Sequence, residues 1–134
     1  MSIILSKMPL VDRMIHIFMN FDRTSKRLYY KYVNDVVFCH NDVVMWTFHN
    51  NHIAKRDYTN NTLTVSLAGW PTMSTMTRLN NLLYKFGSNN ACFKGYGNHR
   101  FLAHPTFCGT PIEADEEIIL ELPTITKILN NNSN

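Results

Sequence analysis

The most distinctive pattern of hydrophobic and polar positions lies between residues 63 and 86, where the hydrophobic period changes. Over residues 63–67 apolar residues alternate with Thr and Ser, which predicts a strand with one apolar face. Further along, apolar residues recur at helical spacing, at Met76, Leu79, Leu82, Leu83 and Phe86. This spacing predicts a helix over about 75–86, with Ser74 or Thr75 as its N-cap and Gly87 just beyond its C-terminus.

The N-terminal segment has a pattern that fits two different structures. Apolar residues spaced three and four apart predict an amphipathic helix from about Leu10 to Asn20. The stretch from His16 to Phe21 also alternates well enough to form a strand. Both alternatives stay open from the sequence.

From residue 28 onward, short runs rich in Val, Tyr, Phe and Trp are separated by pairs of Asn and Asp. Asn and Asp tolerate the left-handed backbone angles of tight turns, so these pairs predict hairpins. The predicted strands span residues 28–33, 36–40, 43–49, 52–57 and 63–67, with shorter ones near 91–94, 100–104 and 117–122. The predicted turns are Asn34-Asp35, Asn41-Asp42, Asn50-Asn51 and Asn60-Asn61. The predicted fold class is α+β: an antiparallel sheet of several short strands, a helix at about 75–86 and, as one of two alternatives, an N-terminal helix.

Length and composition indicate a single domain and the place of the protein in the cell. A chain of 134 residues, 45% of them hydrophobic, suffices for a single domain over residues 1–134 that ends in a frayed polar tail at 130–134. The three cysteines are widely spaced, no secretory signal is visible and no run is long enough to span a membrane, so we expect a cytoplasmic protein without a membrane partner. The net charge of +3 favours an anionic partner only weakly. The many asparagines suit a phage or a bacterium with an AT-rich genome.

No arrangement of chemically active residues predicts catalysis. His49 and His52 flank an Asn pair in a predicted turn, and no Cys or His spacing typical of a metal site occurs. The acidic run over residues 113–117, before the last predicted strand, is typical of a solvated turn or of a sheet edge protected by charge. Cys108 with His104 would need a positioned base and a lowered thiol pKa, and the sequence shows neither. We therefore expect a protein that is not an enzyme and that uses no metal or cofactor.

The segment from Gly69 to Asn80 has the strongest potential for ligand binding. It predicts a strand-to-helix connection rich in hydroxyl groups. The first-turn amides of a helix attract anions because they lack internal partners and carry the positive end of the helix dipole. The alternative is purely structural: Ser74 caps the helix, Trp70 fills the core and Arg78 pairs with a nearby acid.

The same segment resembles a family of small tailed-phage proteins. The similarity covers roughly residues 48–86, and the matching segments are Phe48–Ala54, Leu63–Thr72, Ser74-Thr75 and Arg78-Leu79-Asn80. Members of that family share a strand that ends in Gly-Trp-x-Thr, a Thr-Thr helix start and an Arg-hydrophobic-Asn triplet one turn on. The chain departs from this pattern with Ala68 where a second glycine is common and with Ser74 in place of the first Thr, which are mild changes for a turn and a cap.

More distantly, the chain is similar in size and texture to phage anti-defence proteins of the Thoeris type. Those are oligomers that sequester cyclic ADP-ribose-type or cyclic oligonucleotide messengers without cleaving them. The resemblance implies a phage accessory protein in the cytoplasm of the infected host, which sequesters a small phosphorylated nucleotide-type signal and counters host defence. The ligand-binding residues implied are Trp70, Thr72, Ser74, Thr75, Arg78, Asn80 and Arg100, with Trp70, Phe93 or Tyr96 stacking on the base. We also expect a homo-oligomer, because the run Val43-Val44-Met45-Trp46 is apolar on both faces of its predicted strand.

Two other functions fit the sequence. Tyr29, Tyr30, Tyr32 and Trp46, with Lys26, Arg27 and Lys31 around them, predict a stacking platform for single-stranded nucleic acid. The same aromatic residues would suit a protein-binding accessory protein, such as a host-takeover inhibitor or a virion component. Steep salt dependence of nucleic-acid binding distinguishes the first function, and co-purification of a host protein distinguishes the second.

Overall fold

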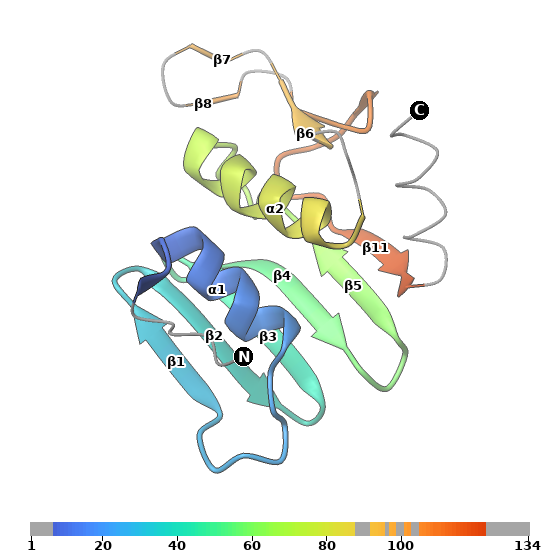
Figure 1. The fold of residues 1–134 in the computed structure, drawn as a ribbon. Coiled ribbons are helices and arrows are strands. Elements are labelled where there is room, and N and C mark those ends of the chain that lie inside the picture. Colours follow the sequence, from blue (N-terminus) through green and yellow to red (C-terminus); the bar gives the residue numbers. More distant parts are fainter. Residues whose placement is uncertain (1–6, 88–91, 96, 99–100, 103–104, 123–134) are drawn as a thin grey trace.

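The computed structural model describes residues 7–87, 92–95, 97–98, 101–102 and 105–122, and these form an α+β fold as predicted (Figure 1). The predicted polar tail at 130–134 lies outside the described residues. The elements follow one another as α1 (Leu10–Met19), β1 (Tyr29–Tyr32), β2 (Asp35–His40), β3 (Val43–Phe48), β4 (Asn51–Asp57), β5 (Thr62–Val65), α2 (Met73–Lys85), β6 (Phe93–Lys94), β7 (Gly97–Asn98), β8 (Phe101–Leu102), β9 (Thr106–Phe107), β10 (Thr110–Pro111) and β11 (Ile118–Glu121).

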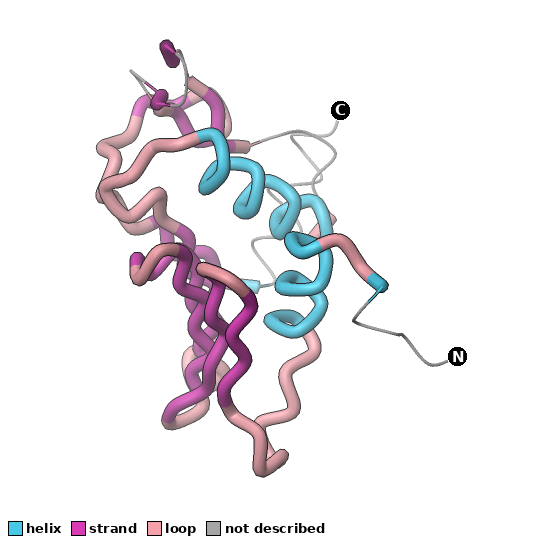
Figure 2. The backbone as a smooth tube through the Cα atoms, turned by 90° about the vertical axis from the view of Figure 1, so that its left-hand side faces the viewer, coloured by secondary structure: helices cyan, strands magenta, loops and turns pink. Residues whose placement is uncertain are grey.

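One antiparallel sheet dominates the described structure, with the strand order β1-β2-β3-β4-β5-β11. The strands β1 to β5 follow one another as neighbours, and β11 comes back to pair with β5, with Leu120 opposite Leu63. Both helices lie against the same face of this sheet (Figures 1 and 2). We call the face under the helices the inner face and the opposite one the outer face.

The hydrophobic core lies between the inner face and the two helices. Phe18 of α1 packs against Trp46 of β3, with their ring centroids 6.0 Å apart. Leu79, Leu82 and Leu83 of α2 are fully buried, so the spacing that predicted this helix marks its buried side. Burial of each such side chain contributes about 1.5–3 kcal/mol relative to exposure.

The N-terminal segment forms α1, so the helix prediction is confirmed and the strand over residues 16–21 is wrong. The buried side chains of α1 are Met14, Ile15, Ile17 and Phe18. A strand would divide these neighbours between its two faces, whereas a helix presents all of them to one side. The sheet supplies that side with an apolar surface, which decides between the alternatives.

Two of the predicted hairpin turns are confirmed. Asn41 and Asp42 connect β2 to β3 with φ angles of 50° and 63°. Asn61, with a φ of 55°, lies in the connection between β4 and β5. Asn and Asp adopt this left-handed conformation at low cost, which is why these pairs signal turns.

The first hairpin turn lies one residue earlier than predicted. β1 ends at Tyr32 and β2 begins at Asp35, so the turn residues are Val33-Asn34 and not Asn34-Asp35. Val33 therefore takes the left-handed conformation, with a φ of 59°. A shift by one residue moves every side chain of a strand to the other face, and the observed register places Asp35 on the inner face.

Asn80 of α2 holds the second, smaller sheet, in which β6, β9 and β10 pair in the order β10-β9-β6. Its side-chain amide donates to Phe93 O at 2.9 Å, and its carbonyl oxygen accepts from Phe93 N at 2.7 Å. Phe93 in turn packs against Phe107, with ring centroids 5.0 Å apart. The Asn80 side chain thus bonds β6 in the way that a neighbouring strand would.

A buried ion pair joins β2 to α2. Arg78 donates from Nε to Asp35 Oδ1 and from Nη2 to Asp35 Oδ2, each at 2.8 Å. Trp46 Nε1 also donates to Asp35 Oδ1 at 2.8 Å. Asp35 is fully buried and Arg78 is 8% exposed. A bidentate pair with a further donor satisfies the carboxylate, and it ties the middle of α2 to one position over the sheet.

We expect Arg78→Ala to lower the free energy of unfolding by about 3–5 kcal/mol, because the Asp35 carboxylate would stay buried without its counter-charge. Urea denaturation followed by circular dichroism measures the change. The surface pair Arg23–Asp42, with an N–O distance of 2.9 Å, is the matched control. Arg23→Ala should cost about 1 kcal/mol or less, and equal losses in the two variants would contradict the assignment.

Val33→Gly is expected to raise the free energy of unfolding by about 1 kcal/mol, because a β-branched residue is strained in the left-handed conformation. Val33 is 74% exposed, so little packing is lost. Thermal unfolding monitored by circular dichroism measures the shift in Tm. Asn41→Gly, at a φ of 50°, is the control and should change stability by less than about 0.5 kcal/mol, because Asn already tolerates this conformation. A lower Tm for Val33→Gly would show that the turn is not strained.

Candidate functional site

The chain between β5 and α2 makes a fixed turn that presents Trp70. Trp70 N–H donates to Leu67 O at 2.9 Å, and the two residues between them, Ala68 and Gly69, have φ angles of 56° and 80°. Gly69 N–H donates to Ala114 O at 2.8 Å, which anchors the turn. The positive φ at position 68 explains why a glycine suits it. Trp70 stays 52% exposed, so it is held at the surface and does not fill the core.

α2 begins at Met73, two residues earlier than predicted, and Thr72 is its N-cap. Thr72 Oγ1 accepts a hydrogen bond from Thr75 N at 3.2 Å, and the two hydroxyl oxygens are 3.0 Å apart. The prediction of Ser74 or Thr75 as the cap is therefore wrong. Met73 is largely exposed, so the apolar periodicity carries no signal in the first turn. Gly87, with a φ of 115°, lies beyond the C-cap as predicted.

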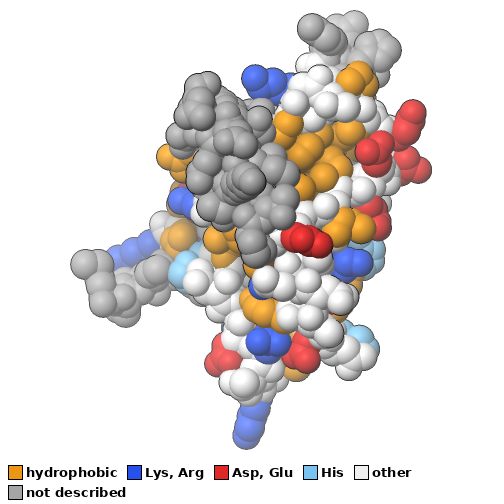
Figure 3. All heavy atoms as spheres, turned by 90° about the vertical axis from the view of Figure 1, so that its right-hand side faces the viewer, with side chains coloured by type: hydrophobic (Ala, Val, Ile, Leu, Met, Phe, Trp, Pro, Cys, Tyr) orange, Lys and Arg blue, Asp and Glu red, His pale blue; other side chains and the backbone are white. Residues whose placement is uncertain are grey.

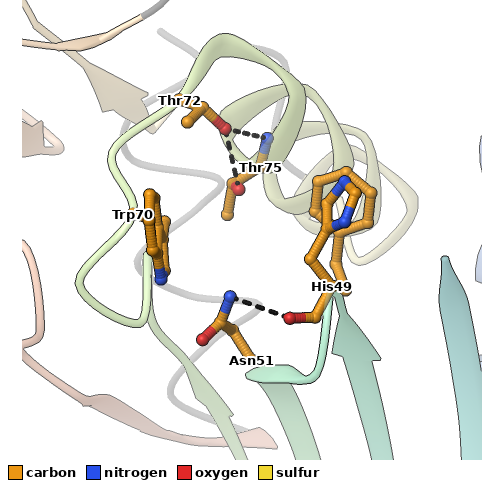
Figure 4. A pocket seen from close by; sticks show the side chains of 6 residues that line it. His49, Asn51, Trp70, Thr72 and Thr75 are labelled. Atoms are coloured by element: carbon orange, nitrogen blue, oxygen red, sulfur yellow. Dashed lines mark hydrogen bonds between the residues drawn. The ribbon is translucent and has the colours of Figure 1, made fainter.

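An open pocket of about 400 Å³ lies between the start of α2 and the turn that joins β3 to β4. Its lining residues are Phe48, His49, Asn51, Trp70, Thr72 and Thr75. Trp70 and His49 lie on opposite sides of the pocket, with Thr75 on the helix side and Asn51 on the sheet side (Figure 4). Aromatic walls with a few polar groups between them are typical of sites that bind planar ligands.

The wall opposite Trp70 is supported by the buried ion pair. The rings of His49 and Phe48 have their centroids 4.4 Å apart. On Phe48 the Arg78 guanidinium carbon lies 3.7 Å from the ring centroid. Asn51 Nδ2 donates to His49 O at 3.2 Å and fixes the turn. The contacts therefore run without a break from Asp35 in the core, through the guanidinium and the phenyl ring, to the pocket.

The structure brings some of the predicted ligand residues together and separates others. Those that line the pocket are Trp70, Thr72 and Thr75. Ser74 is exposed, and its carbonyl oxygen accepts a hydrogen bond from Arg78 Nη1 at 3.2 Å. Arg78 is bonded to Asp35, and Asn80 is bonded to the backbone of β6. Arg100 lies outside the described residues.

A protein-family model described as Kyanoviridae Gp96 protein matches residues 13–111. The chain belongs to this family. The match covers about three quarters of the sequence, and it includes all the lining residues of the pocket together with Asp35 and Arg78. Membership in this family of tailed-phage proteins confirms the predicted phage origin. No curated protein and no solved structure gives a significant match to the chain.

Phe48, His49 and Asn51 line the pocket of this Gp96-family chain but are not among the predicted ligand residues. The sequence places them at the end of a strand and in a predicted Asn50-Asn51 turn. The turn lies one residue earlier, at His49-Asn50, with φ angles of 50° and 66°. The sequence signal that could have found them is the segment Phe48–Ala54, which contains all three and meets Trp70 at this pocket.

The predicted platform for nucleic-acid bases is not assembled. Trp46 is fully buried, and Tyr30 and Tyr32 lie on the inner face. Tyr29 lies on the outer face and is 57% exposed. Neighbouring residues of a strand point to opposite faces, which separates these aromatic side chains. Phe93, predicted as a stacking residue, is also fully buried, and Tyr96 lies outside the described residues.

In the described part of the chain, no group of His, Cys, Asp and Glu side chains could hold a metal ion. The acidic segment before β11 forms an exposed turn, in which Glu116 N–H donates to Glu113 O at 3.1 Å. This agrees with its interpretation as a solvated turn. Neither α1 nor α2 has the length and hydrophobicity that a helix needs to cross a bilayer.

Thr72→Ala is expected to lower the free energy of unfolding by about 1 kcal/mol, because it removes the N-cap hydrogen bond of α2. Ser74→Ala, two residues further along, is the control, and it should change stability by less than about 0.5 kcal/mol. Chemical denaturation of both variants beside the parent protein measures the difference. A larger loss in Ser74→Ala would return the cap to the position that the sequence predicted.

Proposed function

We propose that this phage protein binds and sequesters a small phosphorylated nucleotide-type signal in the cytoplasm of the infected host, and so counters host defence. The observation that carries the proposal is the half-exposed Trp70, held across a pocket from the Phe48–His49 wall at the start of a helix. The pocket volume of about 400 Å³ is at the lower end for small-molecule sites, which suits a ligand of nucleotide size.

The base of the ligand would stack on Trp70, with the His49 side of the pocket as the second wall. Stacking of a base on an aromatic side chain contributes about 1–3 kcal/mol. The hydrogen bonds around Ala68-Gly69 fix the backbone that carries Trp70, so little backbone conformational entropy is lost on binding. The Asn51 amide and the Thr75 hydroxyl offer acceptors and donors to the edge of the base.

The phosphate would lie at the start of α2. First-turn amides and the helix dipole favour an anion there, and Thr72 brings a hydroxyl group to the same place. Among the described residues that line the pocket, none is Lys or Arg. A ligand with one negative charge per phosphate, such as a cyclic phosphodiester, therefore suits this pocket better than a nucleoside triphosphate.

Arg78 would act as a positioning residue for this site. Its Nε and Nη2 atoms bond Asp35, its Nη1 atom bonds Ser74 O, and its planar group lies against Phe48. Replacing Arg78 would disturb the fold and the pocket wall together. Variants of Trp70 therefore test ligand binding more cleanly.

Capture of this kind needs shape, stacking and hydrogen bonds, and it needs no activated nucleophile. The proposed mechanism is accordingly non-enzymatic: the ligand is withheld from its receptor and released unchanged. This distinguishes the protein from a phosphodiesterase that would use the same ligands.

Trp70→Ala is expected to weaken binding of the best ligand at least about tenfold, because it removes the stacking surface. Isothermal titration calorimetry with cyclic mononucleotides, cyclic oligonucleotides and ADP-ribose derivatives measures the affinity. Trp70→Phe should stay within a few-fold of the parent protein, since it keeps an aromatic face. Tyr84→Ala, at an exposed position of α2, is the control and should bind normally.

Two further measurements decide between capture and other functions. The fluorescence of Trp70 should change on ligand binding. The only other tryptophan, Trp46, is fully buried, so the change in fluorescence can be assigned to Trp70. Mass spectrometry should recover the ligand with its mass unchanged after prolonged incubation. A converted ligand would show an enzyme, and an absence of binding to the whole panel would remove nucleotide capture.

A further inference from the structure

The residues on the outer face of the six-stranded sheet form a pattern that is separate from the ligand pocket. A single row of directly opposed residues crosses all its strands, namely Tyr29, Phe38, Met45, Lys55, Thr64 and Ile119. The two ends of this row are the most exposed, with Tyr29 57% and Ile119 65% exposed. The edges of the outer face thus carry two uncovered apolar side chains, one on β1 and one on β11.

The neighbouring row carries opposite charges at its two ends. Lys31 of β1 lies opposite Val36, and this row continues through Thr47 to His52. At the other edge Ile118 pairs with Val65, so the preceding residue, Glu117, reaches the end of the same row. Lys31 and Glu117 are both exposed. One row of the outer face therefore ends in a cation at β1 and in an anion at β11.

The residues around each edge carry charges of the same sign as the row end there, positive near Lys31 and negative near Glu117. Lys26 and Arg27 are exposed just before β1. Exposed acidic residues lie just before β11 and at its end, namely Glu113, Asp115, Glu116 and Glu121. Figure 3 views the molecule from the β11 side, where hydrophobic side chains lie beside acidic ones. The sheet is thus basic at one edge and acidic at the other.

We propose that the outer face binds a second copy of this chain, about a two-fold axis that runs parallel to the strands between the two sheets. This axis reverses the strand order, so β1 of one copy faces β11 of the other. Tyr29 then meets Ile119 of the partner subunit, and Lys31 meets Glu117 of the partner subunit. A two-fold axis across the strands would instead place β1 on β1 and bring like charges together, which opposes association.

The face is large enough for a modest interface. Six strands with a spacing of about 4.8 Å span about 24 Å, and face-to-face sheets in proteins pack with their strands nearly aligned. These strands have four to seven residues, which at about 3.4 Å per residue gives a face of about 300–600 Å². Stable interfaces bury about 800 Å² per partner, so this one is at the weak end and depends on its edge charges. The dimer should therefore dissociate as salt concentration rises. The ligand pocket lies on the helix side of the sheet and stays open in such a dimer, so the dimer and the proposed nucleotide binding can fail independently.

Sedimentation velocity across a range of protein and salt concentrations tests the proposal, with the full chain and its charge-reversed variants. Lys31→Glu and Glu117→Lys should each lower the association constant at least about tenfold, because each pair occurs twice in a two-fold dimer. The double variant, with both charges reversed, should restore association to within a few-fold. Lys85→Glu reverses an exposed charge on α2 and is the matched control that should leave association unchanged.

A protein that is monomeric at every concentration overturns the proposal, and so does a dimer that is indifferent to both charge reversals. A dimer weakened by each single reversal and also by the double one overturns the proposed strand order. A monomer that captures single-stranded DNA through Lys31 would assign the outer face to nucleic acid instead. Circular dichroism of each variant confirms that a change in mass does not reflect unfolding.

Discussion

The buried contact between Asp35 and Arg78 is the constraint on which the rest of this structure depends. A carboxylate without exposure to water is tolerated only where donors surround it, and here the guanidinium and the Trp46 indole supply them. The requirement ties β2, β3 and α2 to one another at a single point. The orientation of α2, and with it the position of its N-terminus, follows from this point as much as from apolar packing.

The same guanidinium links the core to the candidate site. Its plane lies against Phe48, whose ring contacts His49 at the pocket. The segment from Gly69 to Asn80 therefore divides into two parts. Its Gly-Trp-x-Thr part presents the indole and caps α2, whereas its Arg-hydrophobic-Asn part fastens α2 to β2 through Arg78 and to β6 through Asn80.

The alternation of side chains along antiparallel strands separates the two surfaces of interest. The inner face carries the core and the ion pair, and it meets the helices next to the ligand pocket. The outer face carries a row of opposed residues that ends in an exposed apolar side chain at each edge, and the two edges have opposite charge. One sheet can thus support the two proposed functions on separate faces, small-molecule capture on its helix side and self-association on its outer side. The two functions use different residues.

The sequence by itself determined the α+β class, the strands of the six-stranded sheet, the helix at α2 and the hydroxyl-rich connection beside Trp70, because hydrophobic period and turn residues are local signals. Whether Trp70 is buried or exposed was left open and was decided by the tertiary structure. Several other features could not be predicted from the sequence. The shift of the first turn to Val33-Asn34, the choice of Thr72 as cap and the burial of Arg78 depend on which partners the fold brings near. Asp35 and Arg78 are 43 residues apart, and no local pattern predicts that they meet. Only tertiary structure decides such pairings, because a buried charge is stable solely where its distant partner is placed against it.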